Sequence, residues 1–407
     1  TGDIDTVTEP CVCSTTSPGS VCTLRAAIQT ANACTTGAPH TIIFNADYTI
    51  RPVTNLPAVL RDNTTISGVG HTIKIYPADS NSTTRGLAIT GDSCAVHHLW
   101  IQNFGTGIVV YGSSNIIGLK DDGTNDNSEG NTIVLNNTGV EVDTGSFNQV
   151  SGNYIGVDNA GSLSYGNYES GVEISTGFTT IGTDGDGNSD GWEGNVISNN
   201  AEYGIYVTSA GSFATISGNT FGISAKAGTT AAPNDLGGIE LSGSFALIGT
   251  DGNNTSDNTE RNIISGNGYT GINVNGGNGQ KISGNSIGLA GDGSTIVPNS
   301  SSGIRIDETA HNVTIGVDES NTSYSSHERN IISGNTSNGI EIYGYQNTVA
   351  GNYIGLSLDG TANKGNSQSG ISAYGHDNTI GVDSDALASA YEGNVLSLIH
   401  ISQGIVR

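Results

Sequence analysis

The sequence predicts an all-β fold, a right-handed parallel β-helix of about 11–12 coils with a short α-helical cap at its N-terminal end. Three observations predict it: a repeat of about 33 residues, short alternating strands between glycine and asparagine corners, and 60 glycines without long runs of helix formers. A sustained repeat of this length is typical of a solenoid, in which each unit buries its apolar side chains against the neighbouring units.

Two series of asparagines define the repeat. In the first series an acidic residue, one spacer and an asparagine precede an apolar run, at Glu129/Asn131, Glu193/Asn195, Glu260/Asn262, Glu328/Asn330 and Glu392/Asn394. The second series lies between them, at Asn153, Asn219, Asn285 and Asn352. We expect equivalent asparagines to stack as a ladder at one corner and to satisfy backbone groups of their neighbours.

Each unit also contains three short runs that alternate between apolar and polar residues. The clearest begins with glycine, as in Gly139-Val-Glu-Val and Gly238-Ile-Glu-Leu. Alternation with period two indicates strands, and three strands per unit make one coil of a parallel β-helix. At ~4.8 Å per coil, the rod would be roughly 55 Å long.

The organisation along the chain follows from where the repeat is regular. We expect an N-terminal arm with a capping helix over 1–40 and a β-helix over 41–407, with regular coils from 86 to 397. The last coil is incomplete and is followed by no cap, so the sequence predicts an open end that another copy, or a neighbouring segment of a larger surface protein, would cover.

The cysteines lie in the first quarter of the chain and predict disulfides, with a zinc site as the alternative. They are Cys11, Cys13, Cys22, Cys34 and Cys94. Their odd number leaves one thiol free or paired with another chain. Between Cys22 and Cys34, the run TLRAAIQTANA places Leu24, Ala27, Ile28 and Ala31 on one face of a helix, which would close the first coil.

This segment carries a resemblance to a known family. Cys22-Thr-Leu-Arg-Ala-Ala-Ile-Gln-Thr-Ala-Asn resembles the Cys-Ser-Leu-Arg-Glu-Ala-Ile segment that opens many large exported bacterial right-handed β-helix proteins, and the later Gly-Asn-x-Ile-Gly repeats are similar to theirs. The resemblance departs at Ala26, where the family has glutamate. It implies a cell-surface or secreted β-helix, and it implies no agreed catalytic residues.

Charge and composition limit the partners. The formal net charge is −25, from 38 acidic and 13 basic residues, so nucleic acid and polyanionic polysaccharides are poor partners. No apolar stretch reaches the length of a membrane span. The chain begins with threonine and contains no methionine, which predicts that a signal peptide has been removed and that the protein is extracellular or at the cell surface.

The outward residues of the glycine-led strands are the first candidate site. Glu141 and Glu173 would lie on adjacent coils with Asp143 beside them, and like charges that close raise one pKa, as a general acid requires. We therefore predict Glu141, Asp143 and Glu173 as catalytic residues, with Tyr206 and Glu240 as substrate-binding residues. The alternative is a polar face exposed to solvent, without chemistry.

The second candidate site is a calcium loop. After most Ile-Gly corners comes an acidic insertion, and Asp184, Asp186, Asn188 and Asp190 alternate with the hard-oxygen spacing that wraps Ca²⁺. The loop lacks the glycine at the sixth position and the glutamate at the twelfth of an EF-hand. Apart from Ca²⁺, the sequence indicates no cofactor.

Two functions are compatible with these features. The main hypothesis is a cell-surface or secreted structural or adhesive β-helix, part of a larger surface protein or a filament, without enzymatic activity. The alternative is a secreted carbohydrate-active enzyme, a glycoside hydrolase or polysaccharide lyase, or a glycan-binding module that binds neutral glycans on the outer face of the glycine-led strands.

Overall fold

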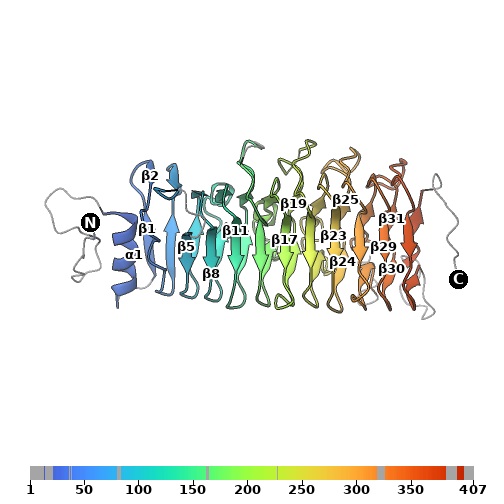
Figure 1. Cartoon of the computed structure of the whole chain (residues 1–407), viewed down its shortest axis with the longest axis horizontal. Helices are drawn as coiled ribbons and strands as arrows, with labels where there is room; N and C mark the ends of the chain where they lie inside the picture. The colour runs from blue at the N-terminus through green and yellow to red at the C-terminus, as the bar shows by residue number, and fades with distance from the viewer. Residues whose placement is uncertain are drawn as a thin grey trace.

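The computed structural model describes residues 13, 22–35, 37, 39–79, 84–161, 165–226, 228–318, 326–381 and 392–397, and it shows a right-handed parallel β-helix (Figure 1). Three sheets of parallel strands run along the rod, and each full coil passes once through each sheet. Two of the sheets have 12 strands, which confirms the predicted fold and number of coils.

Sheet A contains β1 (His40–Ile43), β3 (Thr64–Ser67), β6 (Ala95–His97), β9 (Ile116–Gly118), β12 (Gln149–Ser151), β15 (Thr180–Gly182), β18 (Thr215–Ser217), β21 (Leu247–Gly249), β24 (Lys281–Ser283), β27 (Thr314–Gly316), β30 (Thr348–Ala350) and β33 (Thr379–Ile380). Sheet B contains β2 (Tyr48–Ile50), β4 (Ile73–Ile75), β7 (Trp100–Gln102), β10 (Thr132–Val134), β13 (Tyr154–Ile155), β16 (Val196–Ile197), β19 (Thr220–Phe221), β22 (Ile263–Ile264), β25 (Ser286–Ile287), β28 (Ile331–Ile332), β31 (Tyr353–Ile354) and β34 (Val395–Leu396).

Sheet C holds the glycine-led strands. It contains β5 (Arg85–Ile89), β8 (Thr106–Val110), β11 (Thr138–Val142), β14 (Val172–Ile174), β17 (Tyr203–Val207), β20 (Gly237–Leu241), β23 (Thr270–Val274), β26 (Ile304–Ile306), β29 (Ile340–Ile342) and β32 (Ile371–Ala373). The short helices are α1 (Leu24–Ala33), the 3-10 helix η1 (Asp126–Ser128) and α2 (Asp190–Glu193).

The helix α1 lies at the N-terminal end of the rod, beside β1 (Figure 1). Thr23 caps it by accepting a hydrogen bond from the backbone of Ala26, and Leu24 and Ile28 join the buried core of the β-helix. Ala27 is half-buried rather than buried, because Ala26 and Thr30 face the core with the predicted residues. The helix therefore covers the apolar end of the first coil, as predicted.

Disulfides flank this helix. Cys13 is bonded to Cys22, Cys34 is also disulfide-bonded, and Cys94 is a free, buried thiol. Cys11 and the predicted C-terminal strand at 404–406 lie outside the described residues.

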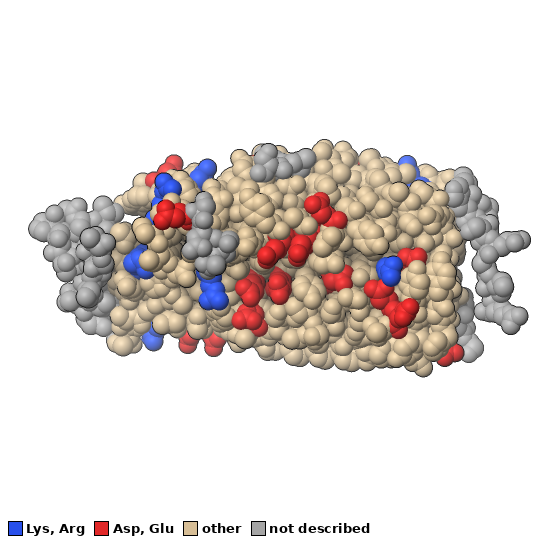
Figure 2. Space-filling model, in the orientation of Figure 1, with Lys and Arg blue, Asp and Glu red and all other residues tan. Residues whose placement is uncertain are grey.

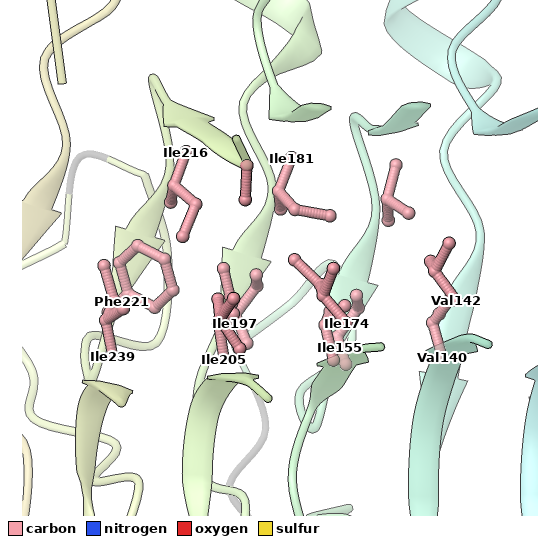
Figure 3. Close-up of a cluster of buried hydrophobic side chains, with 14 of the residues drawn as sticks. Val140, Val142, Ile155, Ile174, Ile181, Ile197, Ile205, Ile216, Phe221 and Ile239 are labelled. Atoms are coloured by element: carbon pink, nitrogen blue, oxygen red, sulfur yellow. The ribbon is translucent and has the colours of Figure 1, made fainter. Parts of the chain in front are cut away.

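The core is one continuous stack of aliphatic side chains inside the rod (Figure 3). In sheet C, Val140 pairs with Val172, and each following strand adds one more residue in register, namely Ile205, Ile239, Ile272, Ile304 and Ile340. All seven are buried. The register confirms the predicted buried column, and it fixes which residues point outward.

Buried asparagines hold the corners between the strands. The two series seen in the sequence form one ladder from Asn131 to Asn394, in which each side-chain amide donates to the side-chain oxygen of the next asparagine. A second ladder, from Asn136 to Asn366, was not predicted.

The Ile-Gly corners require glycine for steric reasons. Gly249 has φ +98°, and a Cβ there would lie 1.8 Å from the carbonyl oxygen of Ser283 in the next coil. Within the described part of the chain, no helix is long and apolar enough to cross a membrane.

Candidate functional site

The outer face of sheet C carries one column of residues in register, in the order that the sequence predicts. From Val109 it continues through Glu141, Glu173, Tyr206, Glu240, Asn273, Arg305, Glu341 and Ser372. Figure 2 shows a band of acidic side chains along the middle of the rod on the face that it presents. The rigid register of ten strands positions these side chains without any mobile loop.

Glu141 and Glu173 are direct cross-strand partners and are both half-buried. Burial raises the pKa of Glu141, and the carboxylate of Asp143 raises it further. Burial also raises the pKa of Glu173, with a further contribution from Glu141. The structure therefore brings together the three residues predicted as catalytic. The repulsion between their carboxylates raises the pKa of Glu141 and of Glu173, which is the direction that the sequence predicts.

The surroundings of this pair are polar and open. Glu141 accepts a hydrogen bond from Thr106 Oγ1 at 3.4 Å and lines a cavity of about 240 Å³ with Arg85 and Glu169. Glu169 accepts a hydrogen bond from Thr138 at 3.0 Å. A patch with this many carboxylates suits hydroxyl donors better than anionic ligands.

Glu240 is the most buried carboxylate on the face, with 4 % of its surface exposed. Its Oε2 accepts a hydrogen bond from Asn273 Nδ2 at 3.0 Å, and the same amide group also donates to Asp307 Oδ2 at 3.4 Å. Burial raises the pKa of Glu240 to about 7, and the Asp307 carboxylate acts in the same direction. Two carboxyl groups therefore share one amide, and with a pKa of about 7 Glu240 is only partly ionised at neutral pH.

Two tyrosines lie next to Glu240. Tyr206 is its cross-strand partner, and the ring of Tyr206 lies 6.1 Å from the ring of Tyr203, tilted by 31°. Burial raises the pKa of the Tyr203 hydroxyl to about 12, and the nearby Glu240 carboxylate adds to the rise. The Tyr203 hydroxyl is therefore a neutral donor at physiological pH, which suits a hydroxyl-rich ligand.

Arg305 fixes the second carboxylate. Its Nε lies 2.6 Å from Asp307 Oδ1, and its Nη1 lies 3.9 Å from Glu341 Oε2, so Arg305 forms ion pairs with both carboxylates. The guanidinium also lies over the ring of Tyr343, at 4.8 Å. Arg305 therefore keeps Asp307 in place beside Asn273, rather than acting as a base.

The acidic loop after β15 brings together only part of the predicted calcium set. Asp184 and Asp190 converge with Glu193, and one carboxylate oxygen of each lies within 4.8 Å of the others. Asp186 and Asn188 instead bond to each other, with Asn188 Nδ2 donating to Asp186 Oδ2 at 2.8 Å. Glu193 was missed because the EF-hand spacing has no glutamate at that position. Calcium at this loop stays a prediction.

A row of stacked phenylalanines was also missed. Phe147, Phe178, Phe213 and Phe245 lie in the turns between sheets C and A, with successive ring centroids 5.4, 4.9 and 5.1 Å apart, and all four are exposed. The phenylalanine that recurs after 31, 35 and 32 residues was the signal in the sequence. Asn273 and Asp307 belong to the predicted outward columns, but the sequence does not show the hydrogen bonds that join them to Glu240 and to each other. Tyr203 was missed, because alternation places it with the inward residues Ile205 and Val207.

Comparison with known proteins gives likeness in structure only. No protein-family model matches the chain, and no curated protein matches its sequence. A mannuronan C-5 epimerase A-module (AlgE6) of Azotobacter vinelandii is 13% identical with a TM-score of 0.43, over 92% of this chain and 94% of that one.

An alginate lyase of Paenibacillus is 14% identical with a TM-score of 0.38, over 86% of this chain and 97% of that one. The Dettilon tailspike protein is 15% identical with a TM-score of 0.38, over 82% of this chain and 60% of that one. At such low similarity, a function for this chain has to come from its own residues.

Proposed function

We propose that this protein acts outside the cell on neutral glycans, and that the outer face of sheet C is its carbohydrate site, centred on Glu240. The observation that carries the proposal is the carboxyl pair on Asn273: Glu240 is 4 % exposed, and Asp307 accepts from the same amide group. One partly protonated and one Arg-bound carboxyl group are the two parts that glycoside hydrolysis needs.

In this proposal Glu240 is the general acid. Its proton goes to the glycosidic oxygen as the bond from that oxygen to the anomeric carbon breaks. Water then forms the new bond to the anomeric carbon, and its proton goes to Asp307, which Arg305 holds at 2.6 Å. Tyr206 and Tyr203 offer rings and hydroxyls to the sugar beside the reacting bond. Glu141 and Glu173 would bind further hydroxyl groups of the same chain.

Calcium takes no part in this proposed chemistry, because the acidic loops connect strands of sheet A to strands of sheet B and the carbohydrate site lies on sheet C. An extracellular location is supported by the Cys13–Cys22 disulfide and by a disulfide at Cys34, since such bonds persist in oxidising compartments.

A screen of neutral oligosaccharides and polysaccharides for new reducing ends tests the proposal. We expect Glu240→Gln to lower kcat by at least about 100-fold and to leave folding intact, because the amide keeps the shape but cannot donate the proton. Glu141→Gln is the matched control on the same face and should change KM more than kcat. Full activity in Glu240→Gln, or loss of kcat only in Glu141→Gln and Glu173→Gln, would move the site to the other carboxylates.

A structural or adhesive role is the second candidate, and the asparagine ladders favour it. The ladder from Asn131 to Asn394 gives each coil from β10 to β34 the same buried hydrogen bonds, as a stiff spacer on a surface needs. If no neutral glycan is cleaved or bound, this role is the better account of the molecule.

A further inference from the structure

We propose that Asp251, Asp257 and Glu260 bind a divalent metal ion, Ca²⁺ by the chemistry of the donors. One carboxylate oxygen of each residue lies within 4.8 Å of the others, in the loop between β21 and β22. All three donors are hard oxygens, which Ca²⁺ prefers. This site is separate from the sheet C face and from the Asp184 loop, and it does not depend on the glycan proposal.

A lysine that binds the carboxylates of the next acidic loop shows that this corner of the coil attracts a cation. Asp318 and Glu328 occupy the positions equivalent to Asp251 and Glu260, because each acidic residue follows a sheet A strand and each glutamate precedes a ladder asparagine by two residues. Lys281 Nζ lies 2.6 Å from Asp318 and 2.5 Å from Glu328. The positive charge at that corner therefore comes from the protein itself.

The same position relative to Glu260 is occupied by an uncharged residue. Lys281 in β24 pairs with β27, the strand that leads into the loop of Glu328. Thr215 in β18 is its equivalent, because it pairs with β21, the strand that leads into the loop of Glu260. Threonine is too short to extend as lysine does, and it carries no charge. Among the described residues, no lysine or arginine forms an ion pair with Asp251, Asp257 or Glu260.

One buried carboxylate oxygen at this corner, Oδ2 of Asp257, accepts no hydrogen bond from the described residues. This residue is 5 % exposed, and its Oδ1 accepts hydrogen bonds from Thr250 Oγ1 and from the backbone of Asn254. Its Oδ2 has no hydrogen-bond partner among the described residues; His327 Nδ1 lies 3.1 Å from it without hydrogen-bond geometry. A buried carboxylate oxygen without a donor is costly, and a bound cation would remove that cost.

The loop of Asp184 differs from the loop of Asp251 in the residue that contacts its glutamate and in the hydrogen bonds of its buried aspartate. There Gln149 Nε2 donates to Glu193 Oε1 at 3.1 Å, and both oxygens of Asp190 accept hydrogen bonds, Oδ1 from Thr183 and Oδ2 from Gly187 and Ser256. The protein already provides donors to these carboxylates. This contrast assigns the metal to Asp251, Asp257 and Glu260 rather than to the loop with the EF-hand-like spacing.

Calcium titration of the full chain, after treatment with a chelator, tests the assignment. Isothermal titration calorimetry with CaCl₂ should show one bound ion for this site in the wild type, and calcium should raise Tm. Thr215→Lys should lose one equivalent of bound calcium, because the introduced ammonium takes the place that Lys281 takes in the next loop. Thr215→Ser is the matched control and should keep both the ion and the rise in Tm.

Glu260→Gln decides the question independently if the lysine variant does not fold, and it should weaken calcium binding at least about 10-fold. An absence of binding in the wild type at millimolar calcium would overturn the proposal. So would an unchanged stoichiometry in both Thr215→Lys and Glu260→Gln, or loss of the ion in Asp184→Asn alone. None of these readouts depends on glycan cleavage.

Discussion

Asn195 Nδ2 donates to Asn219 Oδ1 at 2.8 Å, and through this bond two asparagine series that look separate in the sequence become one ladder. Asn219 in turn donates to the carbonyl oxygen of Ile181 and to Asn262 Oδ1, and its own backbone N–H donates to Asn262 Oδ1. Asn219 thus donates to a backbone carbonyl oxygen of the coil before it, and its side-chain and backbone N–H groups donate to the asparagine of the coil after it. The alternating spacing in the sequence reflects coils with and without an acidic loop.

The first prediction concerns this ladder. Asn219→Ala should lower the free energy of unfolding by about 2–4 kcal/mol, because it leaves buried backbone groups of two coils without partners. Chemical denaturation measures the change. Asn188→Ala, at an exposed asparagine outside the ladder, is the control and should change stability by less than about 0.5 kcal/mol. A similar loss in both variants would show that the ladder is not what stabilises the corner.

The fold could be predicted from the sequence because the same coil is repeated, so an error in assigning one strand is corrected by the equivalent strands of the other coils. The glycine-led strands, the outward column from Glu141 to Ser372 and the buried column from Val140 to Ile340 all follow once one coil has been aligned. The second ladder, beginning at Asn136, escaped because its asparagines lie in loops of variable sequence. Only the stacking of the coils shows that these residues are equivalent.

The second prediction tests the buried column. Ile239 is 1 % exposed and pairs with Ile205 and Ile272. Ile239→Asp should cost at least about 4 kcal/mol, from lost apolar burial and an unpaired interior charge, and should prevent folding of this part of the rod. Circular dichroism and limited proteolysis measure it. Ile239→Val is the control and should fold; a soluble, cooperatively melting Asp variant would contradict the register.

The candidate sites were harder to predict than the fold. The sequence indicates which carboxylates share the outer face, but not how deeply each is buried, and burial is what distinguishes Glu240 from Glu141. The donors around the Asp184 loop could not be predicted for a related reason. Loop spacing shows which oxygens are close in the chain, whereas the donors that already occupy them, such as Gln149, come from another coil.

The third prediction concerns pH. Burial raises the pKa of Glu193 and of Glu240 to about 7, above their ordinary value near 4.5. Between these values the folded protein holds protons that the unfolded chain has released, so the free energy of unfolding should fall as pH rises from about 4.5 to 7 and then level off. Denaturation at pH 5 and pH 8 in the presence of a chelator measures the loss, which we expect to be about 2 kcal/mol or more.

The variant Glu240→Gln serves as the control for the pH dependence. It removes one of the four glutamates whose pKa burial raises to about 7, the others being Glu193, Glu260 and Glu328, and it should make the curve between pH 5 and pH 8 shallower. Stability that rises with pH over this range would contradict the buried, protonated state of these carboxyls.

The last prediction concerns the ion pair that anchors the acidic loop after β27. Glu328 is 1 % exposed and Lys281 is its cationic partner at 2.5 Å, so Lys281→Met removes the charge and keeps most of the aliphatic stem. We expect a loss of about 3 kcal/mol at pH 8, because a buried carboxylate without its partner is much less stable than the pair. The loss should shrink at pH 5, where the Glu328 carboxyl can take up a proton instead.

Lys120→Met is the matched control: Lys120 forms an exposed ion pair with Asp122 at 3.4 Å, and its loss should cost less than about 1 kcal/mol at either pH. Equal, small effects of both substitutions would show that solvent reaches Glu328 and that this corner of the coil does not need a cation.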